Sequence, residues 1–284
     1  MKVYIQSNSY QRLAAKVAAY SFKKQGVIDV NIIDIDDYPI LKKQIGKIYL
    51  RNGKKTVYKN DLQSFTLLRF FPPKLNSYKG KLLIVDPDVF SVKSPMSIMN
   101  FLNNDNNKFL VCTSYNENFR SEVMLVDADK IRWDYEKILF DLFNLKIDYS
   151  DLINLRFVDP NLIQTIPSKY NEHDNIIDNT IILHTTNRIT QPWKEGLKID
   201  FESYANWYSI LKNMIKRFMG REYSKKILSK YYLSHPKSQV NNFVLELFKE
   251  SFEEGVFNKD EITDAVNKKF ISKIFFKKLE TLLN

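Results

Sequence analysis

The sequence predicts an α/β protein whose central sheet is covered by helices on both faces. Through the first two thirds of the 284-residue chain, short apolar runs alternate with longer amphipathic segments. Strands that alternate with helices in this way are typical of the α/β class. Hydrophobic residues make up 44% of the chain, which is enough for a sizeable core.

The strand candidates share a short apolar run. They are residues 3–5, 30–33, 82–85, 109–112, 123–126 and 180–183. Residues 11–24 place apolar side chains at helix spacing, and Gly26 provides the stop signal. Asn52 and Gly53 form a turn signal, so a hairpin is expected near residues 48–58.

The pattern changes near residue 200, where we expect a boundary between residues 1–200 and a basic helical C-terminal region, residues 201–284. Apolar residues at helix spacing follow the boundary. Basic side chains crowd the same stretch, against the lone acid Glu222. They are Lys212, Lys216, Arg217, Arg221, Lys225, Lys226 and Lys230. A second helical pair is expected over residues 238–284, broken near Gly255.

The charge balance favours a polyanionic partner. The chain carries 43 basic and 33 acidic side chains, a net charge of +10. Such a balance fits nucleic acid, an anionic membrane face or phosphorylated small molecules. The sequence contains no zinc-finger spacing, RNP pattern or recognisable helix-turn-helix, so we expect no nucleic acid.

The sequence also restricts the compartment. It has no apolar run of about eighteen residues, so no transmembrane helix is expected, and we expect no signal peptide. Its single cysteine, Cys112, lies in an apolar run and is expected to be a small core residue. A chain that cannot form an internal disulfide fits a reducing compartment. We therefore expect a cytoplasmic protein, or one at the inner face of a membrane.

The strongest local motif is the tripeptide Asp86-Pro87-Asp88, which directly follows the apolar run "LLIV". Ligands of open α/β sheets bind at the carboxyl ends of strands. In an extended segment, side chains two residues apart point the same way, and Pro87 stiffens the backbone between them. Two converging carboxylates suit Mg²⁺ or Mn²⁺ bound to a diphosphate. Two solvated turn acids would give the same pattern.

His184 closes a later apolar run, "TIILHTT". A lone histidine beside a strand is usually structural. Here a polar segment follows it, and adding an imidazole to two carboxylates shifts the preferred ion from Mg²⁺ towards Mn²⁺. In that segment Lys194 offers a point charge for a phosphate.

Four stretches, in this order and at this spacing, resemble the family 8 retaining glycosyltransferases, the group of glycogenin and the bacterial lipopolysaccharide transferases. They are "FTLLRFFPPKLNSYKGKLLIVDPDVF", "RSEVMLVDADK", "KYNEHDNI" and "LHTTNRITQPWKEG". The resemblance spans about residues 1–200. It implies the GT-A fold, a Rossmann-like nucleotide-sugar-binding mixed sheet flanked by helices, here with a helical C-terminal appendage.

The resemblance also implies roles for particular residues. Asp86, Asp88 and His184 would be the metal ligands, with Mn²⁺ or Mg²⁺ as the ion. Asp86 would also belong to the donor site, and Lys194 or Gly196 would meet the donor phosphates.

Two further parts of the donor site follow from the same resemblance. Arg69 would lie near the donor sugar or diphosphate, with a structural salt bridge as the equally weighted alternative. The first loop, with Gln6, Ser7, Asn8 and Tyr10, would bind uracil. Asn8 stands where the family usually has an acid, and it offers an acceptor and a donor to a base edge, while Tyr10 can stack.

The catalytic carboxylate is the least defined part of the expected site. The family's Asp-Gln pair corresponds to "KIDYSDLINL", which offers Asp148 and Asp151 but no Gln. Asp174 is a third candidate, or else binds backbone in its loop. Ser121 and Glu122 stand where the family usually has Gly or Ala.

The function implied is metal-dependent transfer of a hexose, with retention, from a nucleotide-diphosphate sugar, UDP being the expected carrier. The acceptor is an unknown glycan, lipid or small molecule, and an anionic membrane surface is a further expected partner. One alternative is a non-enzymatic basic protein that binds nucleic acid or a membrane surface. Another is a metal-dependent nucleotidyltransferase or phosphatase, whose Gly-rich phosphate loop this sequence lacks.

Overall fold

The structure of the chain, a computed structural model, describes residues 1–103, 107–200 and 229–283. The chain divides into two compact units, Met1–His184 and Thr185–Asn284. The boundary expected near residue 200 stays a prediction. The basic stretch that follows it falls mainly within residues 201–228, outside the described part of the chain.

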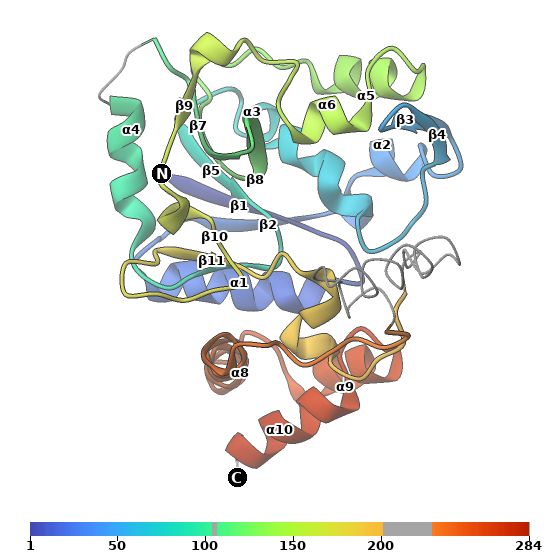
Figure 1. Cartoon of the computed structure of the whole chain (residues 1–284), viewed down its shortest axis with the longest axis vertical. Coiled ribbons are helices and arrows are strands. Elements are labelled where there is room, and N and C mark those ends of the chain that lie inside the picture. The colour runs from blue at the N-terminus through green and yellow to red at the C-terminus, as the bar shows by residue number, and fades with distance from the viewer. Residues whose placement is uncertain (104–106, 201–228, 284) are drawn as a thin grey trace, which may run out of the picture. The chain divides into compact units, whose positions relative to one another are not determined.

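The first unit is built on a six-stranded mixed sheet (Figure 1), in the order β2-β1-β5-β8-β7-β9. The strands are β1 (Lys2–Ser7), β2 (Val30–Asp34), β5 (Lys81–Val85), β7 (Leu110–Tyr115), β8 (Asn118–Asp127) and β9 (Ile163–Thr165). Strand β1 runs parallel to both β2 and β5, whereas β8 runs antiparallel to β5 and β7. The predicted α/β class and mixed sheet are confirmed by this arrangement.

Helices cover both faces of this sheet. They are α1 (Arg12–Lys24), α2 (Pro39–Lys42), α3 (Pro72–Leu75), α4 (Asn100–Asn103), α5 (Tyr135–Phe143) and α6 (Tyr149–Ile153). Because side chains alternate along a strand, Leu82 and Ile84 of β5 join one core cluster, which includes Leu139 of α5 and Leu152 of α6. Figure 1 shows α1 on the opposite face from α3, α5 and α6.

Two smaller sheets complete the first unit. One has the order β10-β11-β6, from β6 (Val89–Ser91), β10 (Glu172–His173) and β11 (Ile182–His184). The other is the hairpin of β3 (Ile48–Arg51) and β4 (Lys54–Val57), as predicted. Its turn residues Asn52 and Gly53 have φ of 52° and 72°, the left-handed conformations that favour this dipeptide in hairpins.

The second unit holds the helices α8 (Ser238–Glu253), α9 (Lys259–Asn267) and α10 (Lys273–Leu283). The sequence predicted two helices over residues 238–284, whereas the structure has three over the described residues 238–283. The expected break occurs at Gly255, with φ of 68°, and Lys269, with φ of 60°, marks a second break. Ser272 then accepts a hydrogen bond from the Phe275 amide at 2.9 Å, within the first turn of α10. A left-handed lysine carries no distinctive sequence signal, which is why the second break was missed.

Among the residues described, none of the helices is both long and apolar enough to cross a membrane.

Candidate metal centre

The pairing of β6 with β11 brings Asp86, Asp88 and His184 together. The two acids fill the connection between β5 and β6, and His184 ends β11 directly opposite Val89. All three side chains are buried. One ligand atom from each lies within 4.8 Å of the others. The chemistry of this set, two carboxylates and one imidazole, fits a divalent cation of the Mn²⁺ type.

A buried hydrogen bond orients the His184 ring. Its Nδ1 lies 3.1 Å from Oδ1 of Asn171, and Asn171 in turn donates from Nδ2 to the Thr113 hydroxyl at 3.1 Å. Because Asn171 Oδ1 can only accept, the proton of the neutral ring lies on Nδ1, which leaves the Nε2 lone pair available to a cation. Nε2 faces Asp88 at 3.5 Å from Oδ1. A histidine held in this way through its other nitrogen is the usual arrangement of a metal ligand.

Two opposing effects set the charge of this histidine. Burial lowers the pKa of His184, but the carboxylates of Asp88, Glu122 and Asp86 together outweigh burial, so the pKa lies above its ordinary value. The carboxylates therefore concentrate negative charge at the ring, which also favours a cation among the three side chains.

Asp86 is fixed by a buried salt bridge to Arg69, which lies on the 3₁₀ segment Ser64–Phe70. Arg69 Nε donates to Asp86 Oδ1 at 2.8 Å, and a second guanidinium nitrogen meets Oδ2. Arg69 also donates to the Ser121 hydroxyl at 2.7 Å. The structural salt bridge weighed from the sequence is therefore present, and the donor contact of Arg69 stays a prediction. Burial raises the pKa of Asp86 to about 6, while Arg69 opposes this shift and Asp88 adds to it.

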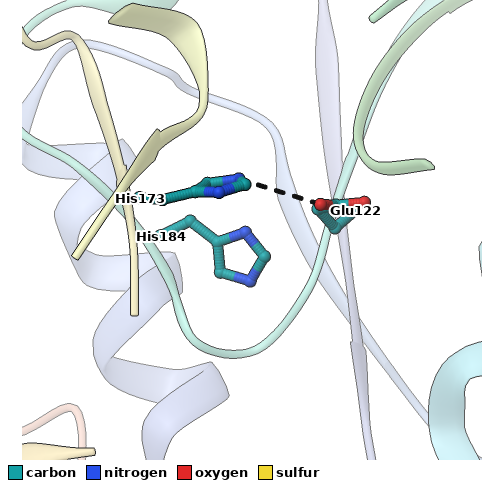
Figure 2. A group of neighbouring side chains, drawn as sticks. All are labelled: Glu122, His173 and His184. Atoms are coloured by element: carbon teal, nitrogen blue, oxygen red, sulfur yellow. Dashed lines mark ion pairs between the residues drawn. The ribbon is translucent and has the colours of Figure 1, made fainter. Parts of the chain in front are cut away.

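Glu122 and His173 lie beside this centre and were missed from the sequence. The Asp86 amide donates to the Glu122 carbonyl at 3.1 Å, one step beyond the registered pair of Val85 and Val123. Figure 2 shows Glu122 facing both histidines, and this second group also lies within 4.8 Å. Glu122 directly precedes the apolar run "VMLV" of β8. A lone carboxylate next to such a run is the sequence signal that could have found it.

Charged neighbours act on both residues. Burial opposes ionisation of Glu122, but His184, Arg69 and Arg120 outweigh it and lower the pKa of Glu122. Arg120 Nε lies 2.7 Å from Glu122 Oε1. Burial and the nearby His184 lower the pKa of His173, so its neutral form is favoured.

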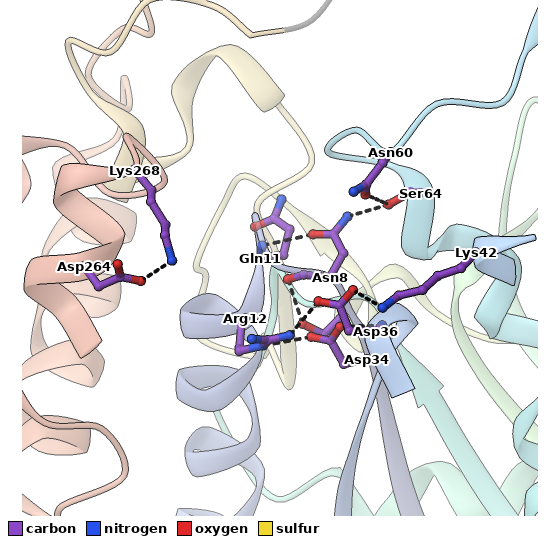
Figure 3. Close-up of polar contacts among 11 residues, drawn as sticks. Asn8, Gln11, Arg12, Asp34, Asp36, Lys42, Asn60, Ser64, Asp264 and Lys268 are labelled. Atoms are coloured by element: carbon purple, nitrogen blue, oxygen red, sulfur yellow. Dashed lines mark hydrogen bonds and ion pairs between the residues drawn. The ribbon is translucent and has the colours of Figure 1, made fainter. Parts of the chain in front are cut away.

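Gln6 and Ser7, expected in the first loop, are instead the last two residues of β1, and Asn8 and Tyr10 follow that strand. The side chain of Asn8 is engaged internally, and Figure 3 shows its contacts with Gln11 and Ser64. Asn8 is buried; its Nδ2 donates to the Asp61 carbonyl at 2.9 Å and to the Ser64 hydroxyl at 3.0 Å. Its Oδ1 accepts from the Gln11 amide at 3.1 Å. Binding a base through Asn8 would require these bonds to be exchanged, and the uracil contact stays a prediction.

The other residues of the expected loop differ in what they contact. Ser7 is buried, and its hydroxyl donates to the Asn8 carbonyl at 3.3 Å. The Tyr10 hydroxyl donates to the Asn60 carbonyl at 3.3 Å. In the amide orientation that satisfies both ends of Gln6, its nitrogen donates to Asp86 Oδ1 at 3.2 Å. Gln6 thus joins the end of β1 to the acidic motif.

Asp148, expected as a catalytic carboxylate, holds the β3–β4 hairpin against α6. It accepts from the backbone amides of Asn52 at 3.0 Å, Gly53 at 2.7 Å and Ser150 at 2.7 Å. Burial opposes ionisation, but these hydrogen bonds and that of the Ser150 hydroxyl lower the pKa of Asp148 to about 2. The geometry gives Asp148 a capping role, and its catalytic role stays a prediction.

The other two residues expected to supply a catalytic carboxylate, Asp151 and Asp174, make contacts elsewhere. Asp151 forms an exposed ion pair with Arg156 at 3.2 Å. Asp174 has a φ of 50°, and its amide donates to the His184 carbonyl at 2.9 Å. Within the described part of the chain, neither belongs to the two groups with metal-ligand geometry.

Lys194 and Gly196 belong to the second unit. Lys194 is fully buried; its Nζ donates to Asp200 Oδ2 at 3.1 Å and lies 5.1 Å from the centre of the Tyr232 ring. Gly196 has a φ of 82°, and an added Cβ would lie 2.6 Å from Ile274 Cδ1. Both features are structural, and the phosphate contacts expected for these residues stay predictions.

Comparison with known proteins gives similarities only at the level of structure. No protein-family model and no curated protein matches the chain. The structure is similar to mouse xyloside xylosyltransferase 1, with a TM-score of 0.41, 10% identity and coverage of 65% of this chain and 97% of that one. It is also similar to the glycosyltransferase GlyE of Streptococcus pneumoniae, with a TM-score of 0.46, 15% identity and coverage of 79% and 66%.

A third similar structure is the galactosyltransferase LgtC in complex with donor and acceptor sugar analogues. Its TM-score is 0.45 and its identity 14%, with coverage of 68% of this chain and 89% of that one. All three are structures of glycosyltransferases, and each is at most 15% identical to this chain.

Proposed function

We propose that this chain is a metal-dependent glycosyltransferase that takes a hexose from a nucleotide-diphosphate sugar, with UDP as the carrier. The observation that carries the proposal is the convergence of Asp86, Asp88 and an oriented His184 at the carboxyl end of β5. Open α/β sheets bind nucleotides at this edge. Because β1 and β5 are parallel neighbours, the end of β1 and the acidic motif lie side by side, joined by Gln6.

The chain's own residues supply the means of holding a diphosphate leaving group. A divalent ion, Mn²⁺ or Mg²⁺, would supply positive charge next to the departing nucleoside diphosphate when bound here. Asp86 and Asp88 supply the carboxylate oxygens for this ion, and His184 supplies Nε2. Arg69 balances part of the charge of Asp86 and holds its carboxylate in place.

The buried cluster favours an enzyme over the non-enzymatic alternative. A basic protein that binds nucleic acid or a membrane needs exposed cations, and gains nothing from two buried carboxylates and a buried imidazole at strand ends. A nucleotidyltransferase or phosphatase would use the same cluster, so the products must separate these reactions.

The finer parts of the proposal rest on the sequence resemblance. Retention of configuration, the uracil base and the hexose follow from it, with an unknown glycan, lipid or small molecule as acceptor. The basic stretch that falls mainly within residues 201–228 would bind an anionic membrane face. If so, binding to anionic vesicles should weaken with salt, since exposed charges are screened over about 10 Å at 0.1 M.

The test is donor hydrolysis without acceptor, with UDP-, GDP- and CMP-sugars in the presence and absence of Mn²⁺. The expected result is slow, Mn²⁺-dependent release of UDP and free sugar. Asp88→Asn keeps the shape and removes a ligand charge, so it should lower the rate about a hundredfold or more. Asp37→Asn, an exposed acid, is the matched control. Release of UMP with sugar phosphate, or equal rates in both variants, would contradict the proposal.

A further inference from the structure

A second group of ligand-type side chains adjoins the first and has no role in the function proposed above. His173 and His184 are directly paired across β10 and β11, so their side chains share one face of the small sheet. Their ring centres are 5.5 Å apart, and the rings are perpendicular. Glu122 faces them from β8, and one ligand atom from each of the three lies within 4.8 Å of the others (Figure 2).

The environment of His173 Nε2 indicates a ligand between these side chains. Part of the His173 ring is exposed, but Nε2 itself is buried and has no hydrogen-bond partner among the described residues. It faces Glu122 Oε1 at 3.8 Å, which is too long for a hydrogen bond. A buried nitrogen without a partner is costly, and a bound ion is one of the recognised explanations.

The spacing fits a shared ion. Two ligands bound at about 2.0–2.2 Å to one tetrahedral ion lie roughly 3.3–3.6 Å apart. The separation of 3.8 Å between His173 Nε2 and Glu122 Oε1 exceeds this by a few tenths of an ångström. Arg120 Nε lies 2.7 Å from the same oxygen, so an ion bound there would share Glu122 Oε1 with Arg120 or displace it. Two imidazoles and one carboxylate are a ligand set for transition metals, found in three-ligand zinc sites.

His184 belongs to both groups, and this limits how they can be filled. One of its ring nitrogens is engaged by Asn171, which leaves one for an ion. An ion held with Glu122 and His173 therefore competes for the same imidazole as an ion held with Asp86 and Asp88.

We propose that Glu122, His173 and His184 form a second cation site for a transition metal such as Zn²⁺, and that filling it excludes an ion from the Asp86–Asp88–His184 centre. The exclusion rests on the metal assignment in the proposed function. The Zn²⁺ site itself does not, because it uses two residues outside that assignment.

The first experiment measures Zn²⁺ and Mn²⁺ affinity separately on the metal-free full chain, by calorimetry or chelator competition. The test variants are Glu122→Gln and His173→Gln. The matched controls are Glu172→Gln, one position before His173 on β10, and His235→Gln in the second unit. Asp88→Asn reports on the other centre.

The expected result is a double dissociation. Glu122→Gln and His173→Gln should each lower Zn²⁺ affinity about tenfold or more, and leave Mn²⁺ affinity within about threefold. Asp88→Asn should do the reverse, and the two controls should change neither. Loss of Zn²⁺ affinity in Asp88→Asn, with both test variants unchanged, would place Zn²⁺ in the first centre and overturn the proposal.

The second experiment needs no variant that might misfold. Zn²⁺ is added to the wild-type chain loaded with Mn²⁺, and free Mn²⁺ is followed by electron paramagnetic resonance. Release of Mn²⁺ as Zn²⁺ binds is expected, whereas binding of both ions at once would overturn the exclusion. If the wild-type chain binds no Mn²⁺, the proposed function fails on its metal site, while the Zn²⁺ comparison of Glu122→Gln with Glu172→Gln still decides the second site.

Discussion

Replacing Arg69 by methionine tests whether this residue serves the fold, the donor or both. The substitution keeps most of the side-chain volume but removes the guanidinium from a buried pair, leaving the Asp86 carboxylate without its partner. Breaking a buried salt bridge from one side costs about 3–5 kcal/mol, because an uncompensated charge remains in a low-dielectric environment. Loss of the hydrogen bond to the Ser121 hydroxyl adds to this cost.

The cost should depend on pH, and its sign follows from Asp86. Burial holds the pKa of Asp86 at about 6 even with Arg69 present, well above the value of about 3.9 in an unfolded chain. Without Arg69 the folded pKa rises further. Below about pH 4 the carboxyl is neutral in both states and no penalty arises. As pH rises towards and through the folded pKa, the unfolded state loses its proton first, so stability falls. The variant should therefore lose less stability at pH 5 than at pH 8.

The assay is urea unfolding of the metal-free chain at pH 5 and pH 8. Arg156→Met is the matched control, since its exposed ion pair with Asp151, 3.2 Å long, should contribute only about 0–1 kcal/mol. If Arg69→Met loses no more stability than the control, or loses the same amount at both pH values, the buried-pair argument is refuted. A residue that only binds donor would leave the stability of the metal-free chain unchanged and weaken binding of the UDP-sugar.

Two further predictions separate positioning and structural roles from catalysis. Asn171→Ala removes the acceptor that orients His184, so Mn²⁺ affinity should fall about ten- to a hundredfold while the ion-free fold is retained. Calorimetry measures the affinity, and Thr113→Val, which removes only the hydroxyl that accepts from Asn171, should cause a smaller loss. Asp148→Asn weakens the acceptor for three backbone amides, so stability should fall by about 0.5–2 kcal/mol while donor hydrolysis is unchanged. Because the folded pKa of Asp148 is depressed to about 2, its contribution to the free energy of unfolding should be full above about pH 4 and lost as pH falls towards 2. A large loss of turnover in Asp148→Asn with stability intact would instead support the catalytic role.

Local pattern was enough for much of the fold. The six predicted strands correspond to strands of the two larger sheets, and residues 11–24 correspond to α1. Most edges shift by one or two residues, but β7 ends three residues later than predicted and β8 begins five residues earlier. Asn52 and Gly53 predicted the hairpin because their left-handed conformations are a property of the dipeptide itself. The short strands β6, β9 and β10 were missed, since each has only two or three residues and little periodicity of its own.

The sequence by itself thus determined the α/β class, the acidic motif at the end of a buried strand and a histidine at the end of another. These are properties of a few neighbouring residues. Tertiary structure alone decided which side chains meet: the pairing of β6 with β11 brings His184 to Asp88, and the register of β5 with β8 sets Glu122 opposite Asp86. It also engaged Asn8 and Asp148 in internal hydrogen bonds. Strand register is fixed by contacts between distant parts of the chain, and a shift of one residue turns every side chain to the other face.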